Sequence, residues 1–170
     1  DAARELCGDC RPALLAAADL ALTAADHEAA IEPLQRLHAL GADARVRGLL
    51  VAALWNAGRP AAVAAVLDTV PGARLSGEEM MVLVQVERRL GRSARAVAWA
   101  RGEAGDLPSG WSPPADFWAI TAEICLGAGE PAAALQALDR ALDLRPGVAL
   151  YHHNRAAALA ALGPGLGESP

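Results

Sequence analysis

The chain has 170 residues, of which 54% are apolar and only 4% aromatic, and its formal net charge is −5. This length suits a single domain with a sizeable core. The mild acidity argues against a nucleic-acid-binding domain, which normally carries a basic stripe. Alanine is abundant, which favours helices packed closely on helices. Lysine is absent and arginine takes its place, a bias typical of a GC-rich bacterial genome.

No stretch is long and apolar enough to span a bilayer. The longest early apolar run, Ala13 to Ala25, is too short and is interrupted by Asp19. The sequence shows no signal peptide and begins at Asp1 without methionine, which indicates an excised or processed piece. We therefore predict a cytoplasmic location, or a periplasmic one if a signal has been removed.

The first half of the chain predicts four helices after a short lead-in at residues 1–10. Their expected ranges are Pro12 to Ala25, Glu28 to Leu40, Asp43 to Ala57, and Pro60 to about Pro71. Gly41 is suited to a left-handed helix stop. Pro33 falls inside the second helix, so that helix is expected either to kink or to start later.

The second half predicts five more helices. Ser76 and Glu79 form a capping box before the fifth helix, which ends at Leu90 and Gly91. Ser93 is expected to cap a sixth helix. The remaining segments are a long loop at 105–114, two helices within 115–147, a last helix at 148–162 and a flexible tail at 163–170.

Residues 115–147 carry the clearest motif. Trp118, Ala122 and Cys125 share one helical face, and the small and large residues of the next helix form a matching stripe made of Ala134, Leu138 and Ala141. Between the two helices lies a corner with Gly127, Gly129 and Pro131, and Pro146 closes the second helix. The corner repeats, because residues 58–68 align with 129–139, and 91–100 form a weaker copy.

This unit resembles a tetratricopeptide repeat, a helix–turn–helix unit of about 34 residues. The resemblance implies an all-α fold, a right-handed α-solenoid of about four helical hairpins plus a C-terminal capping helix. The expected repeat domain covers 11–162, with repeats near 11–42, 44–75, 77–113 and 115–147 and the extra helix at 148–162. One hairpin cannot bury its own apolar face, so neighbouring hairpins are expected to stack.

The resemblance also implies a concave groove lined by the first helix of each hairpin. The slots that face it are expected to hold Arg45, Trp55, Met81, Gln85, Arg88, Glu123 and His153, with Leu15, Asp19, Ala52, Asp116 and Ala119 beside them. Such a groove suits an extended or helical segment with apolar anchors and a carboxylate. For Arg88 a second interpretation is open, in which it and Arg89 form a solvated charged face.

No constellation of residues predicts catalysis, a metal site or a cofactor. Cys7 and Cys10 form a Cys-x-x-Cys pair, for which a structural role is favoured over redox or zinc chemistry, since no second ligand pair accompanies it. Cys125 is expected to be a small core residue. His152 and His153 are adjacent and point about 100° apart on a helix, so they suit surface polarity better than metal binding.

The sequence therefore predicts a non-catalytic module that binds a protein or peptide segment and organises an assembly, without nucleic acid or membrane insertion. Two alternatives are open: a bacterial secretion or assembly chaperone that shields a client helix, and a regulatory domain cut from a larger enzyme or transcription regulator. Apolar helix faces could also bury a second copy of the chain. Some tetratricopeptide proteins bind the C-terminal carboxylate of a chaperone through lysines and asparagines in the groove. This function is disfavoured here, because the corresponding positions hold Leu15, Asp19, Leu49, Glu78 and Val82.

Overall fold

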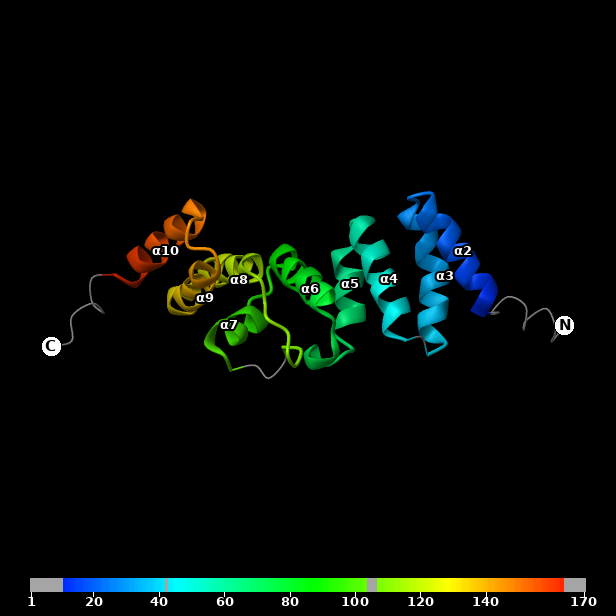
Figure 1. The fold of residues 1–170 in the computed structure, drawn as a ribbon, viewed down its shortest axis with the longest axis horizontal. Helices are drawn as coiled ribbons and strands as arrows, with labels where there is room; N and C mark the ends of the chain where they lie inside the picture. Colours follow the sequence, from blue (N-terminus) through cyan, green and yellow to red (C-terminus); the bar gives the residue numbers. More distant parts are fainter. Residues whose placement is uncertain (1–10, 42, 104–106, 164–170) are drawn as a thin grey trace. The chain divides into compact units, whose positions relative to one another are not determined.

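A computed structural model describes residues 11–41, 43–103 and 107–163, and these ranges are helical throughout apart from their turns and loops, without a strand (Figure 1). The elements are α2 (Arg11–Thr23), α3 (His27–Ala39), α4 (Ala44–Asn56), α5 (Pro60–Leu67), the 3₁₀ turn η1 (Gly72–Arg74), α6 (Gly77–Leu90), α7 (Ala94–Arg101), α8 (Ala115–Gly127), α9 (Pro131–Leu144) and α10 (Ala149–Leu162). The predicted all-α class is confirmed.

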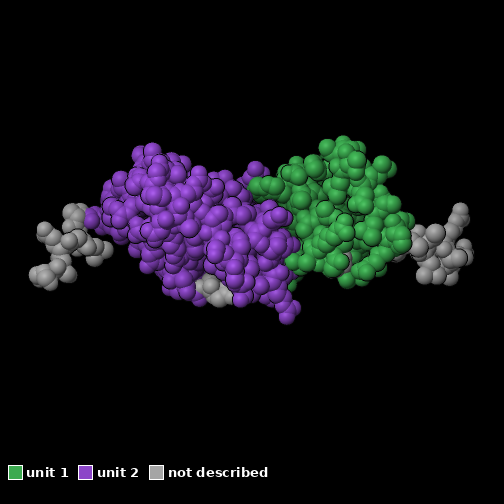
Figure 2. Space-filling model, in the orientation of Figure 1, with its two compact units in different colours: residues 1–69 green, residues 70–170 purple. Residues whose placement is uncertain are grey.

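The chain forms two compact units, residues 1–69 and 70–170 (Figure 2). In the first unit, α2 packs on α3, α3 on α4 and α4 on α5. In the second unit, α8 is central, because it packs against α6, α7, α9 and α10. Successive helices thus pair as hairpins in each unit, as the α-solenoid prediction requires. The expected repeat boundaries and a single continuous domain stay predictions.

Side-chain caps fix the starts of several helices. Asp26 accepts a hydrogen bond from the backbone of Ala29 at the start of α3, and Asp43 does the same for Val46 in α4. The Ser76–Glu79 capping box is formed in both directions, at 2.7 and 3.1 Å. Each cap satisfies an orphan backbone N–H of the first turn.

Two local predictions need correction. The α3 helix begins at His27 and continues through Pro33, so a later start is wrong. Pro33 is buried beside Ile31, Leu34 and Leu37, and this burial offsets the cost of a proline inside a helix. Ser93 precedes α7, but its side chain accepts no capping hydrogen bond, because its backbone is already helical rather than extended.

Some predictions fall outside the described residues. They are the lead-in at 1–10 with Cys7 and Cys10, and most of the tail predicted at 163–170.

An aromatic cluster forms the core of the second unit. The ring of Phe117 in α8 lies 5.3 Å, between centroids, from each of three tryptophan rings, those of Trp99, Trp111 and Trp118. Two of these contacts are edge-on, the geometry that aromatic quadrupoles favour. Arg140 of α9 stacks its guanidinium on Trp118 at 4.5 Å and donates to the carbonyl of Trp99 at 3.0 Å. The cluster therefore joins α7, α8, α9 and the loop before α8.

The predicted small-residue stripes are buried between α8 and α9. Ala122, Cys125, Ala134, Leu138 and Ala141 are all fully buried, as expected for two helices in close contact. Burial and the neighbouring Glu130 carboxylate raise the pKa of the Cys125 thiol from 9.0 to about 11, while Arg101 partly opposes them. Cys125 is thus the core residue that the sequence predicts.

Gly77 provides a test of how the loop with Trp111 is held. A Cβ added at Gly77 would lie 2.4 Å from Nε1 of Trp111, so Gly77→Ala must displace a ring that packs on Phe117. We expect a loss of about 1–3 kcal/mol in unfolding free energy, measured by urea denaturation followed by tryptophan fluorescence. In the same unit, Gly127→Ala meets nothing within 4 Å and should instead be neutral or stabilising by up to about 1 kcal/mol. Equal effects of the two substitutions would contradict this account.

The raised pKa of Cys125 predicts a pH dependence of stability. Because the folded pKa of about 11 lies above the ordinary value of 9.0, unfolding releases a proton between these two values. The free energy of unfolding should fall by roughly 2–3 kcal/mol as the pH rises through this window, at 1.36 kcal/mol per pKa unit, and should level off above it. Cys125→Ala should show a correspondingly smaller decrease between pH 9 and 11, and parallel pH profiles of the two proteins would refute the assignment.

Candidate functional site

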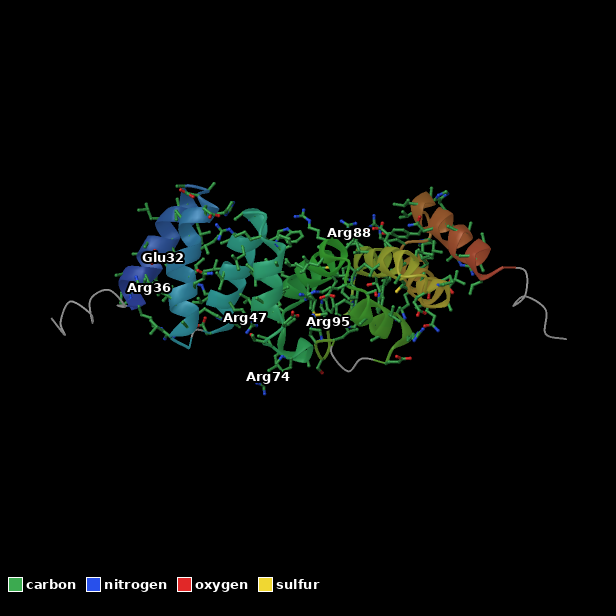
Figure 3. All side chains as sticks on the ribbon, turned by 180° about the vertical axis from the view of Figure 1, so that it is seen from behind. Glu32, Arg36, Arg47, Arg74, Arg88 and Arg95 are labelled. Atoms are coloured by element: carbon green, nitrogen blue, oxygen red, sulfur yellow. The ribbon has the colours of Figure 1, made fainter. Side chains whose placement is uncertain are left out.

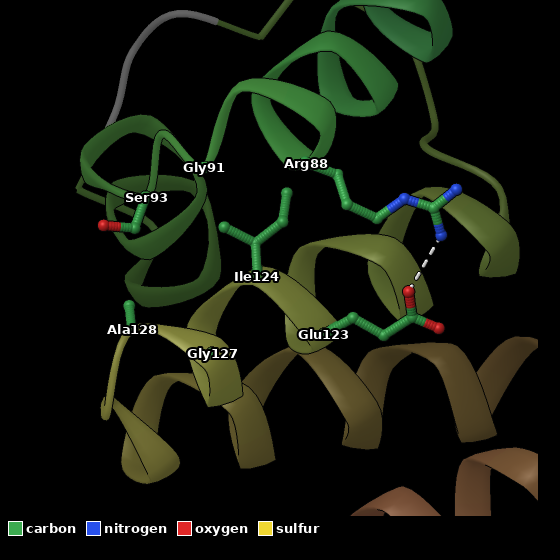
Figure 4. Close-up of a pocket in the computed structure, with 7 residues that line it drawn as sticks. All are labelled: Arg88, Gly91, Ser93, Glu123, Ile124, Gly127 and Ala128. Carbon is green, nitrogen blue, oxygen red and sulfur yellow. Dashed lines mark hydrogen bonds and ion pairs between the residues drawn. The ribbon is translucent and has the colours of Figure 1, made fainter.

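A pocket of about 400 Å³ opens in the second unit between the C-terminal ends of α6 and α8. Figure 4 shows Ile124 between the Arg88–Glu123 pair on one side and the backbone turns that end the two helices on the other. Its lining consists of Arg88, Gly91, Ser93, Glu123, Ile124, Gly127 and Ala128. The pocket thus combines an apolar floor with one ion pair.

Arg88 is held in place by two neighbours. Its guanidinium donates one hydrogen bond to Gln85 at 2.7 Å and one to the carboxylate of Glu123 at 2.9 Å, the second of which is drawn in Figure 4. Arg88 is labelled among all the side chains in Figure 3. An arginine has five N–H donors, so these two bonds fix its orientation and leave donors available on a side chain that is 45% exposed. Three predicted groove residues, Gln85, Arg88 and Glu123, therefore meet in one cluster.

Glu87, one position before Arg88, has a different environment. Its side chain is only 3% exposed and lies 3.3 Å from Arg95 and 3.9 Å from Arg92. A buried carboxylate of this kind ties the end of α6 to the start of α7. Glu87 therefore stabilises the contact between α6 and α7, whereas its neighbour Arg88 faces the pocket.

The first unit has a smaller pocket, of about 130 Å³, between α2, α3 and α4. It includes three predicted groove residues, Leu15, Asp19 and Arg45. Its remaining lining residues are Arg11, Leu37, Asp43, Val46 and Leu49. The first helices of successive hairpins therefore line a pocket in this unit as well.

The other predicted groove residues are placed individually. Trp55 of α4 and Met81 of α6 are half-buried, while His153 of α10 is exposed. Asp116 accepts hydrogen bonds from Tyr151 at 2.8 Å and Arg145 at 2.9 Å, and burial together with this bond raises the pKa of Tyr151. Ala52 is exposed, whereas Ala119 is buried and lines neither of the two pockets. A groove that combines residues of both units stays a prediction.

The backbone part of the pocket was not predicted from the sequence. Gly91, Ser93, Gly127 and Ala128 belong to helix ends, for which only turns and a cap were expected. Ile124 follows the predicted groove residue Glu123 by one position. No short-range pattern marks these residues as pocket residues, because their place on the pocket wall depends on how two helix ends meet.

Two kinds of site are not found in the described ranges. There, no group of three or more histidine, cysteine, aspartate or glutamate residues is arranged to hold a metal ion. None of the helices in those ranges is long and apolar enough to cross a membrane.

Comparison with known proteins identifies the fold. No protein-family model and no curated protein sequence matches the chain. Among solved structures, the chain is similar to the crystal structure of MamA protein, a protein with tetratricopeptide repeats, with a TM-score of 0.71 and 18% sequence identity. The similarity covers 92% of this chain and 84% of the MamA chain. The fold is that of a tetratricopeptide-like helical repeat.

Two glutamates test the division between folding and pocket residues. We expect Glu87→Gln to lower the unfolding free energy by about 1–3 kcal/mol, because it removes a buried charged hydrogen-bond acceptor from Arg95. Glu123→Gln alters a solvent-exposed ion pair and should change stability by less than about 1 kcal/mol. Both values can be measured by urea denaturation. A larger loss for Glu123→Gln than for Glu87→Gln would reverse the assignment.

Proposed function

We propose that this protein is a non-catalytic interaction module that binds an extended or helical segment of a partner protein and thereby organises an assembly. The observation that carries the proposal is the cluster of Gln85, Arg88 and Glu123 beside the pocket in the second unit. The fold supports it, because tetratricopeptide-like hairpins expose the faces of their first helices for binding.

The chemistry of the pocket suggests which segment it takes. An apolar side chain of the partner would pack on Ile124, where burying apolar area contributes about 25 cal/mol per Å². A carboxylate on the same segment would accept hydrogen bonds from the donors that Arg88 has left. Since Gln85 and Glu123 already orient this guanidinium, little side-chain entropy is lost on binding.

Glu123 also sets a limit on this recognition. Its carboxylate occupies one edge of Arg88, so a partner carboxylate must share the guanidinium with it or displace it. A segment that is only apolar, or that carries only basic residues, has no carboxylate to accept hydrogen bonds from Arg88. The pocket should therefore prefer segments in which an apolar side chain and an acidic residue lie close together.

A peptide selection tests the proposal. Random peptides displayed on phage are selected on the immobilised protein, and the affinities of the enriched peptides are measured by fluorescence anisotropy. Ala128→Trp places an indole in the pocket without changing charge and should weaken binding at least about tenfold. Arg88→Ala should weaken binding of peptides with an acidic residue and spare the same peptides with that residue changed to its amide.

Ala132→Trp is the matched control, because Ala132 is exposed on α9 and does not line the pocket. It should bind the selected peptides as the parent protein does. Equal losses in Ala128→Trp and Ala132→Trp, or no enrichment of any peptide family, would rule out this pocket as the binding site. Equal helix content in all variants, measured by circular dichroism, excludes misfolding as the cause.

A further inference from the structure

The exposed large apolar residues of the described ranges gather on the elements nearest the two chain ends. They are Leu15 and Leu20 on α2, Leu40 after α3, Leu144 at the end of α9, and Leu150 and Leu159 on α10. Single exposed leucines are ordinary on a protein surface. Their concentration on the first and last helices indicates that these helices have faces suited to contact with another helix.

The α10 helix follows the register of a hairpin's first helix. A shift of 34 residues places Tyr151 at the position of Phe117, and Gly163 at the position of Gly129, with φ +74° in both glycines. The face of α8 that carries Trp118, Ala122 and Cys125 is buried, and α9 packs on α8. The α8–α9 pair therefore shows, within this chain, which kind of helix can pack on a helix such as α10.

The corresponding face of α10 is exposed. By the same shift, Trp118, Ala122 and Cys125 correspond to His152, Ala156 and Leu159, and each of these three residues is exposed. Ala149 and Ala160 flank this stripe and are exposed as well. By analogy with α9 on α8, the helix that covers this stripe of α10 should run antiparallel to it and should carry small residues and leucine along one side.

The α2 helix has such a side. Leu14 and Ala18 are its buried residues, and α2 packs on α3. Away from this face, Ala13, Ala16, Ala17 and Leu20 recur at helical spacing, and all four are exposed, with Leu20 at 74%. Alanines at such a contact let two helix axes approach to about 8 Å.

We infer that α2 of a second copy of this chain packs antiparallel on the exposed stripe of α10. In this orientation Leu20 of one copy and Leu159 of the other lie toward opposite ends of the helix pair, each facing alanines of its partner helix. Alternation of large and small residues across facing positions is the pattern that lets helices interdigitate. In the α8–α9 pair, the small Ala122 and Cys125 on α8 and the larger Leu138 on α9 are all fully buried.

The charges of the two helices complement each other in the antiparallel orientation. The first turn of α10 has no acidic residue and the last turn of α2 has no basic one, so neither helix end is compensated within its own helix. Antiparallel packing places Asp19 of α2 near the positive N-terminal end of α10, where His152 lies. It also places His152 near the negative C-terminal end of α2, whereas Arg155 is already paired with Asp139 of its own chain. A parallel arrangement loses both effects.

The contact is heterologous, because the two surfaces in it are different. Each copy offers one α2 and one α10, so the association continues from copy to copy as a ring or an open chain. One helix pair buries less than a standard interface of about 1,200–2,000 Å², so we expect weak association, in the micromolar range or above.

The test uses two complementary variants of the full chain under reducing conditions. Leu20→Glu introduces a charge on α2, and Leu159→Glu introduces one on α10. Sedimentation velocity of the parent protein should show a mass that rises with concentration, and each variant alone should associate at least about tenfold more weakly. Mixing the two variants should restore a complex of two chains, because the intact α10 of one pairs with the intact α2 of the other.

Leu150→Glu is the control. Leu150 lies on α10 and is 54% exposed, like Leu159 at 46%, but it points away from the stripe. This variant should associate as the parent does. The inference is overturned if the parent stays monomeric up to about 1 mM, or if the mixture of Leu20→Glu and Leu159→Glu stays monomeric. It is also overturned if either variant alone dimerises as strongly as the parent, which would indicate contact between like surfaces.

Discussion

Phe117 is the residue on which the second unit depends. Its ring contacts three tryptophans that come from α7, from α8 itself and from the loop before it, and Arg140 adds α9 through Trp118. Trp111 in turn lies against Gly77 at the start of α6. Five of the six aromatic residues of the chain lie in this unit, and Trp55 is the exception. Aromatic packing, which the alanine-rich helices otherwise lack, thus sets the positions of four helices at once.

The pocket is a consequence of this packing. Once Phe117 and Trp99 fix α7 against α8, the C-terminal ends of α6 and α8 have defined positions, and Glu87 holds the α6 end through Arg95. Arg88 and Glu123 then face each other across the two helices at 2.9 Å. An exposed ion pair of this kind adds little stability. Its geometry is set by the core below it, so the two residues can serve binding without being needed for folding.

The sequence predicted what depends on local chemistry and helical period. The capping box at Ser76, the buried stripe of Ala122, Cys125 and Leu138, and the all-α hairpins follow from short-range patterns. Trp111 could not be predicted in this way, because its contacts with Gly77 and Phe117 join segments that are far apart or irregular. The same limit applies to Ser93 and Ala128, whose place on the pocket wall depends on how two helix ends meet.

Repeat architecture links the two proposals in this protein. Each hairpin needs a neighbour to cover its apolar face, and each first helix keeps one face open, because covering it would block binding. On α8 both demands are met, since α9 buries Cys125 while Glu123 faces the pocket. On α10 the residue equivalent to Cys125 is Leu159, which is exposed. The proposed binding in the pocket and the proposed pairing through α10 therefore use different faces, so the two proposals are compatible in one chain.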